Sequence, residues 1–160
     1  MTKPVILCID DHREILVALK NALAIFRGYT AIYTCESAEE AEIVLNDIDQ
    51  KGYYLAIVIS DHVLPGKSGV DFLSDIHRDF RFNRTKKLLL TGLATHRETI
   101  DAINRADING YIEKPWSNDE LIQRIRVLLT DYVFDAGLDY NDFMPVLDKD
   151  TLYAVLRCRP

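Results

Sequence analysis

The strongest constraint on the fold of this chain is an alternation of short apolar runs with segments whose apolar residues recur at helical spacing. The runs that predict buried strands cover residues 5–9, 30–35, 55–60, 87–90 and 110–112. A helical pattern follows each of these runs. Strands that alternate with helices form a parallel sheet covered by helices on both faces. The sequence therefore predicts an α/β protein with a doubly wound, five-stranded parallel sheet of the (βα)5 type.

Three capping boxes support the number of helices. In a capping box, a serine or threonine and a glutamate three residues later satisfy free backbone N–H groups at the start of a helix. The pairs Ser37 with Glu40, Thr95 with Glu98, and Ser117 with Glu120 stand where the alternation requires a helix to begin. The core faces predicted by helical spacing are Ile15, Leu16, Leu19, Leu23 and Phe26; Ala41, Val44, Leu45 and Ile48; Phe72, Leu73 and Ile76; Ile100, Ile103 and Ala106; and Leu121, Ile125, Leu128 and Leu129.

The charge balance argues against direct binding of nucleic acid. Nineteen Lys and Arg face 25 Asp and Glu, a net charge of -6, whereas such a surface needs clustered basic residues. Basic residues do gather at Arg78, Arg81, Arg84, Lys86 and Lys87, where a helix end and its loop predict a solvated surface.

The apolar segments predict neither a membrane span nor a signal peptide. No apolar run approaches the roughly 20 residues that cross a bilayer, and the first apolar stretch is short and lacks a cleavage site. We therefore expect a soluble, cytoplasmic protein that binds no membrane. Cys8 and Cys35 lie in predicted strands and are expected to be small buried apolar residues.

Polar side chains stand at the ends of four predicted strands. Asp10 and Asp11 follow the first, Asp61 the third and Thr91 the fourth, while Lys114 comes two residues after the fifth. Because the carboxyl ends of parallel strands form the ligand crevice, these residues should converge. Adjacent carboxylates repel one another unless a cation lies among them, and oxygen ligands suit Mg²⁺ or Mn²⁺. The pattern indicates a metal-dependent phosphoryl site.

Four segments of the chain resemble the receiver domain of bacterial two-component response regulators. They are ILCIDDHREIL at 6–16, VISDHVLPGKSGVDFL at 58–73, LLLTGLA at 88–94 and GYIEKPW at 110–116. The resemblance covers about residues 3–130 and implies a flavodoxin-like sheet with strand order 2-1-3-4-5. It divides the chain into a receiver domain at 1–130 and a C-terminal extension or linker at 131–160.

The resemblance also implies a role for each acidic residue of the site. Asp61 would be the phosphoacceptor, attacking phosphorus to form an aspartyl phosphate. Asp11, Asp61 and the backbone carbonyl of Val63 would bind Mg²⁺ directly, and Asp10 would act through water. No other cofactor is implied.

The resemblance implies that two further residues contact the phosphoryl group and that a third residue responds to it. Lys114 and the Thr91 hydroxyl would neutralise and bind the phosphoryl oxygens. Tyr111 would be the switch aromatic that turns into space left by Thr91. Gly66 and Gly69 would form a tight turn after Asp61, and Pro115 would follow Lys114 through a cis peptide bond.

By the same resemblance the chain is a signalling module and not an enzyme with a separate substrate. It would accept phosphoryl groups from a histidine kinase or phosphotransfer protein, or from small donors, and would hydrolyse its own aspartyl phosphate. The surface formed by helix 4, strand 5 and helix 5 would then control an output domain or protein, and a homodimer is a further expected partner.

Two alternative functions compete with this reading. A phosphorylation-independent pseudo-receiver would bind a partner without the chemistry, but such domains have usually lost part of the acidic site. A haloacid-dehalogenase-like phosphohydrolase would need a second Asp two residues after the nucleophile, where this chain has Val63.

Residues 131–160 fall outside the (βα)5 pattern. Their aromatic residues could dock the segment on the domain, and Asp148 or Asp150 could cap a short helix over 151–157. The sequence leaves open whether the segment is a linker, a docked arm or a dimerisation element.

Overall fold

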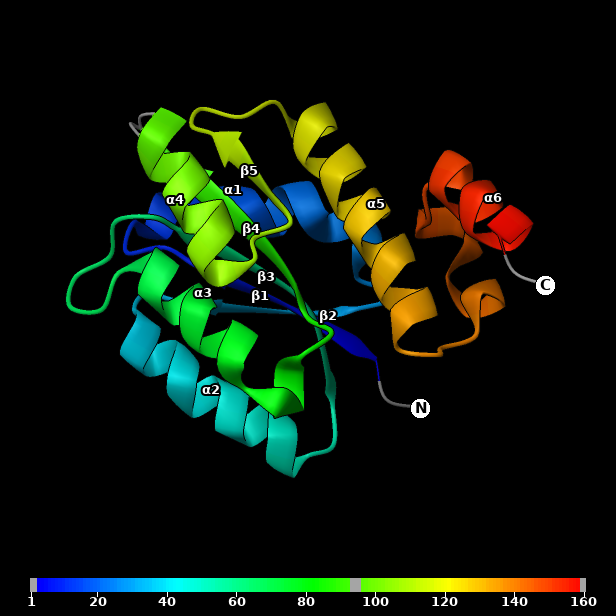
Figure 1. Cartoon of the computed structure of the whole chain (residues 1–160), viewed down its shortest axis with the longest axis horizontal. Helices are drawn as coiled ribbons and strands as arrows, with labels where there is room; N and C mark the ends of the chain where they lie inside the picture. Colours follow the sequence, from blue (N-terminus) through cyan, green and yellow to red (C-terminus); the bar gives the residue numbers. More distant parts are fainter. Residues whose placement is uncertain (1–2, 93–95, 159–160) are drawn as a thin grey trace.

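The computed structural model describes residues 3–92 and 96–158 and is shown in Figure 1. An α/β sandwich occupies most of the chain, with a helical C-terminal segment beside it. In chain order the elements are β1 (Pro4–Ile9), α1 (Arg13–Ala22), the 3-10 helix η1 (Leu23–Phe26), β2 (Ala31–Cys35), α2 (Ala38–Gln50), β3 (Tyr54–Asp61), α3 (Gly69–Arg78), η2 (Phe80–Phe82), β4 (Lys86–Thr91), α4 (His96–Ala106), β5 (Gly110–Glu113), α5 (Asn118–Asp135), η3 (Tyr140–Val146) and α6 (Lys149–Cys158).

The five strands form one sheet in the order β2-β1-β3-β4-β5, and every described pairing is parallel. This confirms the predicted fold class and strand order. Because the order reverses between β1 and β3, the chain winds helices onto both faces of the sheet. All five strands therefore end at the same edge, where the predicted site residues stand.

Two apolar clusters lie on opposite faces of the sheet. One packs α1 and α5 against alternate strand residues such as Ile6 and Cys8, and the other packs α2 and α3 against their neighbours Val5, Leu7 and Ile9. Both clusters are built largely from side chains less than 10 % exposed, which explains why the central strands are apolar throughout. Cys8 and Cys35 are buried in them as expected.

The predicted helix starts are confirmed where the structure describes them. The Ser37 and Ser117 hydroxyls accept the backbone N–H groups of Glu40 and Glu120, at 3.1 and 3.4 Å. The Thr95 box lies outside the described residues. Ser68, which the sequence analysis did not single out, caps α3 in the same way by accepting the Asp71 N–H at 3.1 Å.

Two predictions about individual side chains are wrong. Ile100 was expected on the core face of α4 but is 53 % exposed, while Ala106 of the same helix is buried. Lys87 was expected on a solvated surface but is only 4 % exposed, because it belongs to β4, an interior strand of the sheet.

The C-terminal segment is docked against α5. This helix continues past residue 130 to Asp135, and the segment then folds back as η3 and α6. Phe143 and Val146 join the apolar cluster under α5, and the Arg126 guanidinium donates to the Pro145 carbonyl at 3.1 Å. In Figure 1, α6 lies on the side of α5 away from α4 and β5. No helix within the described ranges is long and apolar enough to cross a membrane.

Asp148 anchors this segment through several hydrogen bonds. Its carboxylate accepts the Thr151 N–H and hydroxyl at 3.0 and 2.6 Å and the Gln123 amide at 2.8 Å. These hydrogen bonds lower the pKa of Asp148, since they stabilise the charged form.

We predict that Asp148→Ala lowers the free energy of unfolding by about 1–2 kcal/mol, because a helix cap and a contact to α5 are both lost. Urea denaturation of the full chain measures the change. Asp150→Ala is the matched control, since Asp150 is exposed in the first turn of the same helix. Equal losses in the two variants would contradict the capping role of Asp148.

Gly69 is required by a close approach of two backbone segments. A Cβ at this position would lie 1.7 Å from the Asp61 carbonyl oxygen, while the Gly69 N–H donates to the His62 carbonyl at 3.0 Å. We predict that Gly69→Ala destabilises the fold by about 1–3 kcal/mol through overpacking. Gly28→Ala, whose Cβ would meet nothing within 4 Å, should change stability much less in the same urea titration.

Candidate functional site

The side chains of the candidate site come from four neighbouring strands. Asp10 follows β1, Asp61 ends β3, Thr91 ends β4 and Lys114 follows β5. Backbone hydrogen bonds keep these ends aligned: the Lys114 N–H donates to the Thr91 carbonyl at 2.8 Å, and the Asp10 N–H donates to the Cys35 carbonyl at 3.1 Å. Residues more than 100 positions apart therefore meet at one edge of the sheet.

Lys114 bridges the two buried carboxylates of the site. Its Nζ lies 2.7 Å from Asp10 Oδ2 and 3.3 Å from Asp61 Oδ2. Asp10 and Asp61 are 0 % and 6 % exposed, and buried carboxylates are costly unless they are paired. The Lys114–Pro115 peptide bond is cis, as the resemblance implied.

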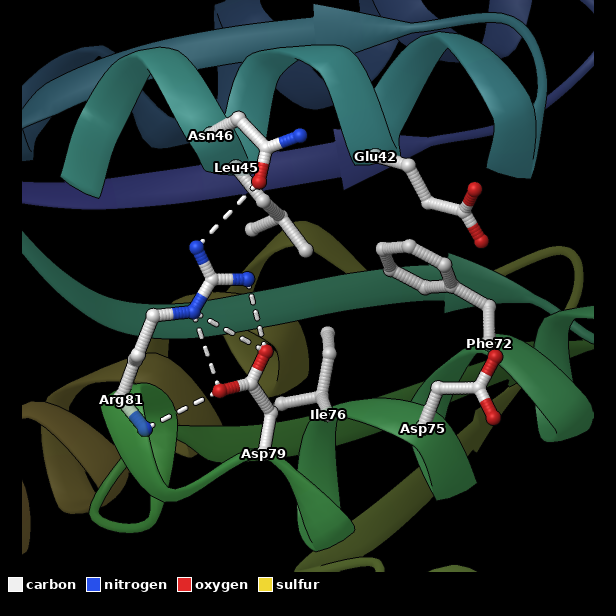
Figure 2. Close-up of a pocket in the computed structure, with 8 residues that line it drawn as sticks. All are labelled: Glu42, Leu45, Asn46, Phe72, Asp75, Ile76, Asp79 and Arg81. Carbon is white, nitrogen blue, oxygen red and sulfur yellow. Dashed lines mark hydrogen bonds and ion pairs between the residues drawn. The ribbon is translucent and has the colours of Figure 1, made fainter. Parts of the chain in front are cut away.

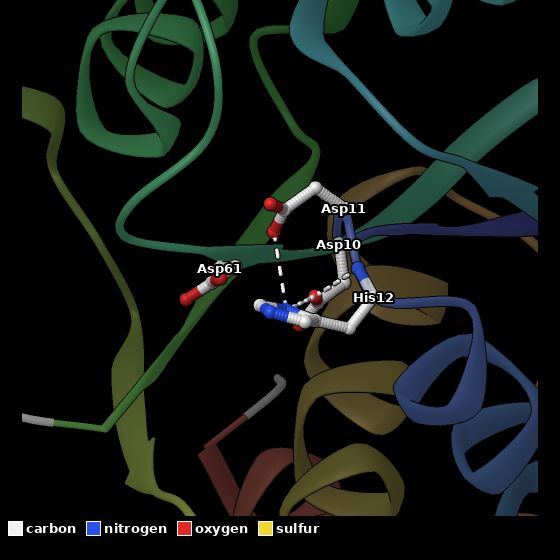
Figure 3. Close-up of side chains that lie close together, drawn as sticks. All are labelled: Asp10, Asp11, His12 and Asp61. Atoms are coloured by element: carbon white, nitrogen blue, oxygen red, sulfur yellow. Dashed lines mark hydrogen bonds and ion pairs between the residues drawn. The ribbon is translucent and has the colours of Figure 1, made fainter.

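His12 joins the acidic group and was not identified from the sequence. Its Nδ1 lies 3.0 Å from Asp10 Oδ1 and 3.2 Å from Asp11 Oδ1, as Figure 3 shows. One ligand atom from each of Asp10, Asp11, His12 and Asp61 lies within 4.8 Å of the others. The only signal in the sequence was the position of His12 directly after the Asp pair.

Burial and neighbouring charges shift the pKa values of this group. Desolvation raises the pKa of Asp61, and the charge of Asp10 adds to this, while Lys114 acts in the opposite direction. The pKa of His12 is also raised, chiefly by its hydrogen bond with Asp10 and by the charge of Asp11. The site therefore attracts positive charge, as the carboxylate repulsion argument predicted.

The other predicted site residues lie around this group. Thr91 is buried at the end of β4, and Tyr111 is partly buried in β5, packed against the apolar cluster under α3. Val63 stands two residues after Asp61 in the loop before α3, with its side chain 74 % exposed. Residues 93–95, directly after Thr91 and Gly92, lie outside the described residues.

The loop after Asp61 forms the predicted tight turn. Gly66 has a φ of 76°, a left-handed conformation that favours glycine. Gly69 has no such backbone angle and is needed for its close approach to Asp61. Lys67 in this loop pairs with Glu42 and Asp75, so it points away from the acidic group and is not a phosphate ligand.

A separate groove between α2 and α3 offers no comparable chemistry. Figure 2 shows its lining, with Phe72 and Ile76 among the side chains and Arg81 at one end. The Arg81 guanidinium donates to Asp79 at 2.8 Å, to Asn46 at 3.2 Å and to Asp49 at 3.3 Å. Its charge is therefore satisfied within the groove.

A family model for the response regulator receiver domain matches residues 6–126. The hydrogenase transcriptional regulatory protein HoxA of Cupriavidus necator is 30 % identical over 122 residues, which are 76 % of this chain and 23 % of HoxA. The transcriptional regulatory protein CpxR of Escherichia coli K12 is 25 % identical over 148 residues, covering 92 % of this chain and 59 % of CpxR. The chain thus spans less than two thirds of the length of these relatives.

Among solved structures, the signal receiver domain of an HD domain-containing protein from Pseudomonas fluorescens Pf-5 superimposes with a TM-score of 0.74. The two chains are 27 % identical, and the match covers 86 % of this chain and 94 % of the other.

We predict that Asp61→Asn raises the denaturation midpoint of the metal-free protein at pH 7. Because the pKa of Asp61 is raised on folding, its ionised form costs stability at any pH above its unfolded pKa of about 3.9. The gain should shrink as the pH falls toward 4, because a growing fraction of the folded carboxyl is then protonated and uncharged.

Urea denaturation in EDTA between pH 4 and 7 measures this effect. Asp47→Asn, in an exposed ion pair with Lys51, is the control and should show no such gain. A lower midpoint for Asp61→Asn at pH 7 would mean that the Asp61 charge stabilises the fold.

Proposed function

The chain belongs to the response regulator receiver domain family, and we propose that Asp61 accepts a phosphoryl group in a Mg²⁺-dependent reaction. The observation that carries this proposal is the position of the Lys114 ammonium between Asp10 and Asp61, at 2.7 and 3.3 Å. That arrangement joins a carboxylate nucleophile to a cation that can neutralise charge on an incoming phosphoryl group. Two-component signalling is thus the function that the site supports best.

Asp61 is suited to act as the nucleophile. In the transfer, one of its carboxylate oxygens forms a bond to phosphorus while the bond from phosphorus to the leaving group of the donor breaks. With acetyl phosphate as donor, acetate leaves with the bonding electron pair. Lys114 already contacts one Asp61 oxygen, so its ammonium is in place to interact with the transferred group.

The ligand set fits a divalent cation. Asp11 and Asp61 would bind the ion together with the Val63 carbonyl, and Asp10 would act through water, as the resemblance implies. The close approach of Asp10, Asp11 and Asp61 supports this, since it brings carboxylate oxygens within 4.8 Å of one another. Oxygen ligands favour Mg²⁺, and Mn²⁺ is the second candidate. When bound, the ion would offset the negative charge of the carboxylates and of the phosphoryl oxygens.

Switching would follow from the charge added at Asp61. A phosphoryl group brings almost two negative charges and three acceptor oxygens, so the Thr91 hydroxyl would move to donate to it. Tyr111, on the strand beside β4, would then turn inward. The α4–β5–α5 surface would carry the change to an output domain or protein.

The phosphoryl donor would be a histidine kinase or a phosphotransfer protein. An apolar hollow of about 430 Å³ opens beside Lys114, lined in part by Ile15, Pro115 and Trp116. A protein donor could bury apolar side chains there while its phosphorylated residue reaches Asp61. The downstream output and a homodimer are further proposed partners.

The two alternative functions are weaker for specific reasons. A haloacid-dehalogenase-like mechanism requires an acid–base carboxyl two residues after the nucleophile, and Val63 cannot supply a proton. A pseudo-receiver needs none of the acidic residues, yet the carboxylates and the lysine all meet at one place. The proposed activity is that of a signalling receiver with self-catalysed phosphorylation and dephosphorylation.

Intact-protein mass after incubation with acetyl phosphate tests the proposal. We predict an added phosphoryl mass that requires Mg²⁺ and is absent from Asp61→Asn. Lys114→Met should reduce the rate of adduct formation by at least tenfold, since the transferred group loses its cation.

Asp47→Asn is the matched control for the loss of a carboxylate and should be phosphorylated normally. The absence of an adduct in a folded sample that binds Mg²⁺ would favour the phosphorylation-independent binding module. An adduct that survives in Asp61→Asn would move the phosphoacceptor to another residue.

A further inference from the structure

Lys87 belongs to the basic cluster at residues 78–87 but, unlike its neighbour Lys86, is buried. It lies near the start of β4 and is 4 % exposed, at the edge of the sheet opposite Asp61. Its immediate neighbour Lys86 is paired with Asp135, the two charged groups lying 2.6 Å apart. Lys87 makes no such pair with any residue of 3–92 or 96–158. A lysine buried to this extent normally has a partner, because a charged group loses its hydration on burial.

The Lys87 ammonium is not completely buried. Every fully enclosed side-chain nitrogen and oxygen of the described residues has a hydrogen-bond partner, yet Lys87 Nζ has neither a hydrogen bond nor an ion pair with them. Its ammonium is therefore not fully enclosed. Lys87 is one of the residues that line a cavity of about 280 Å³. Burial lowers the pKa of Lys87, as expected for an ammonium with little hydration.

Further hydrogen-bond donors line the same cavity. Asn109 is fixed by two hydrogen bonds with the Lys87 backbone: its Oδ1 accepts the Lys87 N–H at 2.7 Å, and its own N–H donates to the Lys87 carbonyl at 2.9 Å. The Asn109 carboxamide oxygen is thereby used, and its NH₂ group stays available as a donor. Arg84 and Asn83 complete this side of the cavity, and in the described part of the chain neither side chain has an ion pair or hydrogen bond.

The charges around the cavity leave an excess of positive charge. Arg84, Lys86 and Lys87 are three cations against the two carboxylates Asp107 and Asp135. Asp135 is neutralised by Lys86. The Asp107 side chain is 75 % exposed and lies 3.8 Å from His77 Nδ1, so it stands at the rim. Within the described residues, Lys87 and Arg84 make no ion pair, although the charge of Asp107 acts on Lys87 at longer range.

We propose that this cavity, the β4 basic pocket, binds a phosphate-type oxyanion through Lys87, Arg84 and Asn109. An ammonium, a guanidinium and a carboxamide that approach from different elements suit an anion with several acceptor oxygens. The cavity of about 280 Å³ is larger than a phosphate ion. It can therefore hold either inorganic phosphate or the phosphate group of a nucleotide.

Amide NMR of the full chain tests the proposal. The titration uses the Asp61→Asn variant in EDTA, so that neither phosphorylation nor a metal ion contributes. Inorganic phosphate is added, with potassium chloride at equal ionic strength as the blank. We expect saturable shifts at the amides of Lys87, Asn109 and Arg84, and none of comparable size in the chloride blank.

Variants of the pocket sharpen the test. Lys87→Met, which keeps an unbranched side chain only one atom shorter and removes the charge, should weaken phosphate binding at least tenfold. Lys87→Arg should retain binding within about threefold, because it keeps the charge. Asp107→Asn should bind several times more tightly, since a carboxylate that repels the anion is removed.

Adenosine 5′-monophosphate distinguishes the two sources of the anion. Tighter binding of the nucleotide than of inorganic phosphate would assign the pocket to nucleotides, and the reverse order would assign it to the free anion. Shifts that match the chloride blank would overturn the proposal. So would equal phosphate affinity in folded Lys87→Met and in the parent protein. None of these results depends on phosphorylation of Asp61, so the two proposals can fail separately.

Discussion

The contact of one ammonium with two buried carboxylates is the interaction on which the arrangement of the site depends. Asp10 and Asp61 are almost completely buried, and Lys114 lies within 3.3 Å of both. Removing charged groups from water costs more than a single ion pair returns unless the geometry is good and the remaining lone pairs are satisfied. Here the aligned ends of β1, β3 and β5 supply the geometry. The fold and the site therefore constrain each other, and a change in the charge of Asp61 must alter both.

The sequence predicted the sheet and the convergence of Asp10, Asp11, Asp61 and Lys114, because both follow from local patterns. Short apolar runs define the strands, and a polar residue after each run marks the edge where ligands bind. What it missed depends on three-dimensional contacts that the apolar pattern does not specify. His12 is exposed and enters the acidic group only because Asp10 and Asp11 hold its ring. Gly69 was predicted for the angles of a tight turn, but it is needed because its backbone passes close to the Asp61 carbonyl, a contact that no local pattern reveals.

Errors about burial have a different origin. Helical spacing placed Ile100 on a core face, but an apolar residue on a helix is buried only where the neighbouring elements cover it, and this one is 53 % exposed. The predicted helix end and loop placed Lys87 on a solvated surface, and lysine is seldom buried. The position of β4 between β3 and β5 overrides that preference. The sequence also did not decide whether the C-terminal segment docks on the domain, because docking depends on tertiary contacts of Phe143 and Asp148 with α5.

The two proposed sites lie at opposite ends of the same strand and require opposite charges. Thr91 ends β4 beside the acidic group, and Lys87 stands four residues earlier, a distance of about 13 Å along a strand. That separation exceeds the Debye length of about 8 Å at physiological salt, so direct coupling through solvent is weak. A direct structural connection also exists. The Asn109 side chain is hydrogen-bonded to the Lys87 backbone, and Tyr111 lies two residues after Asn109 in β5. The start of β5 therefore connects the β4 basic pocket to the strand that carries Tyr111.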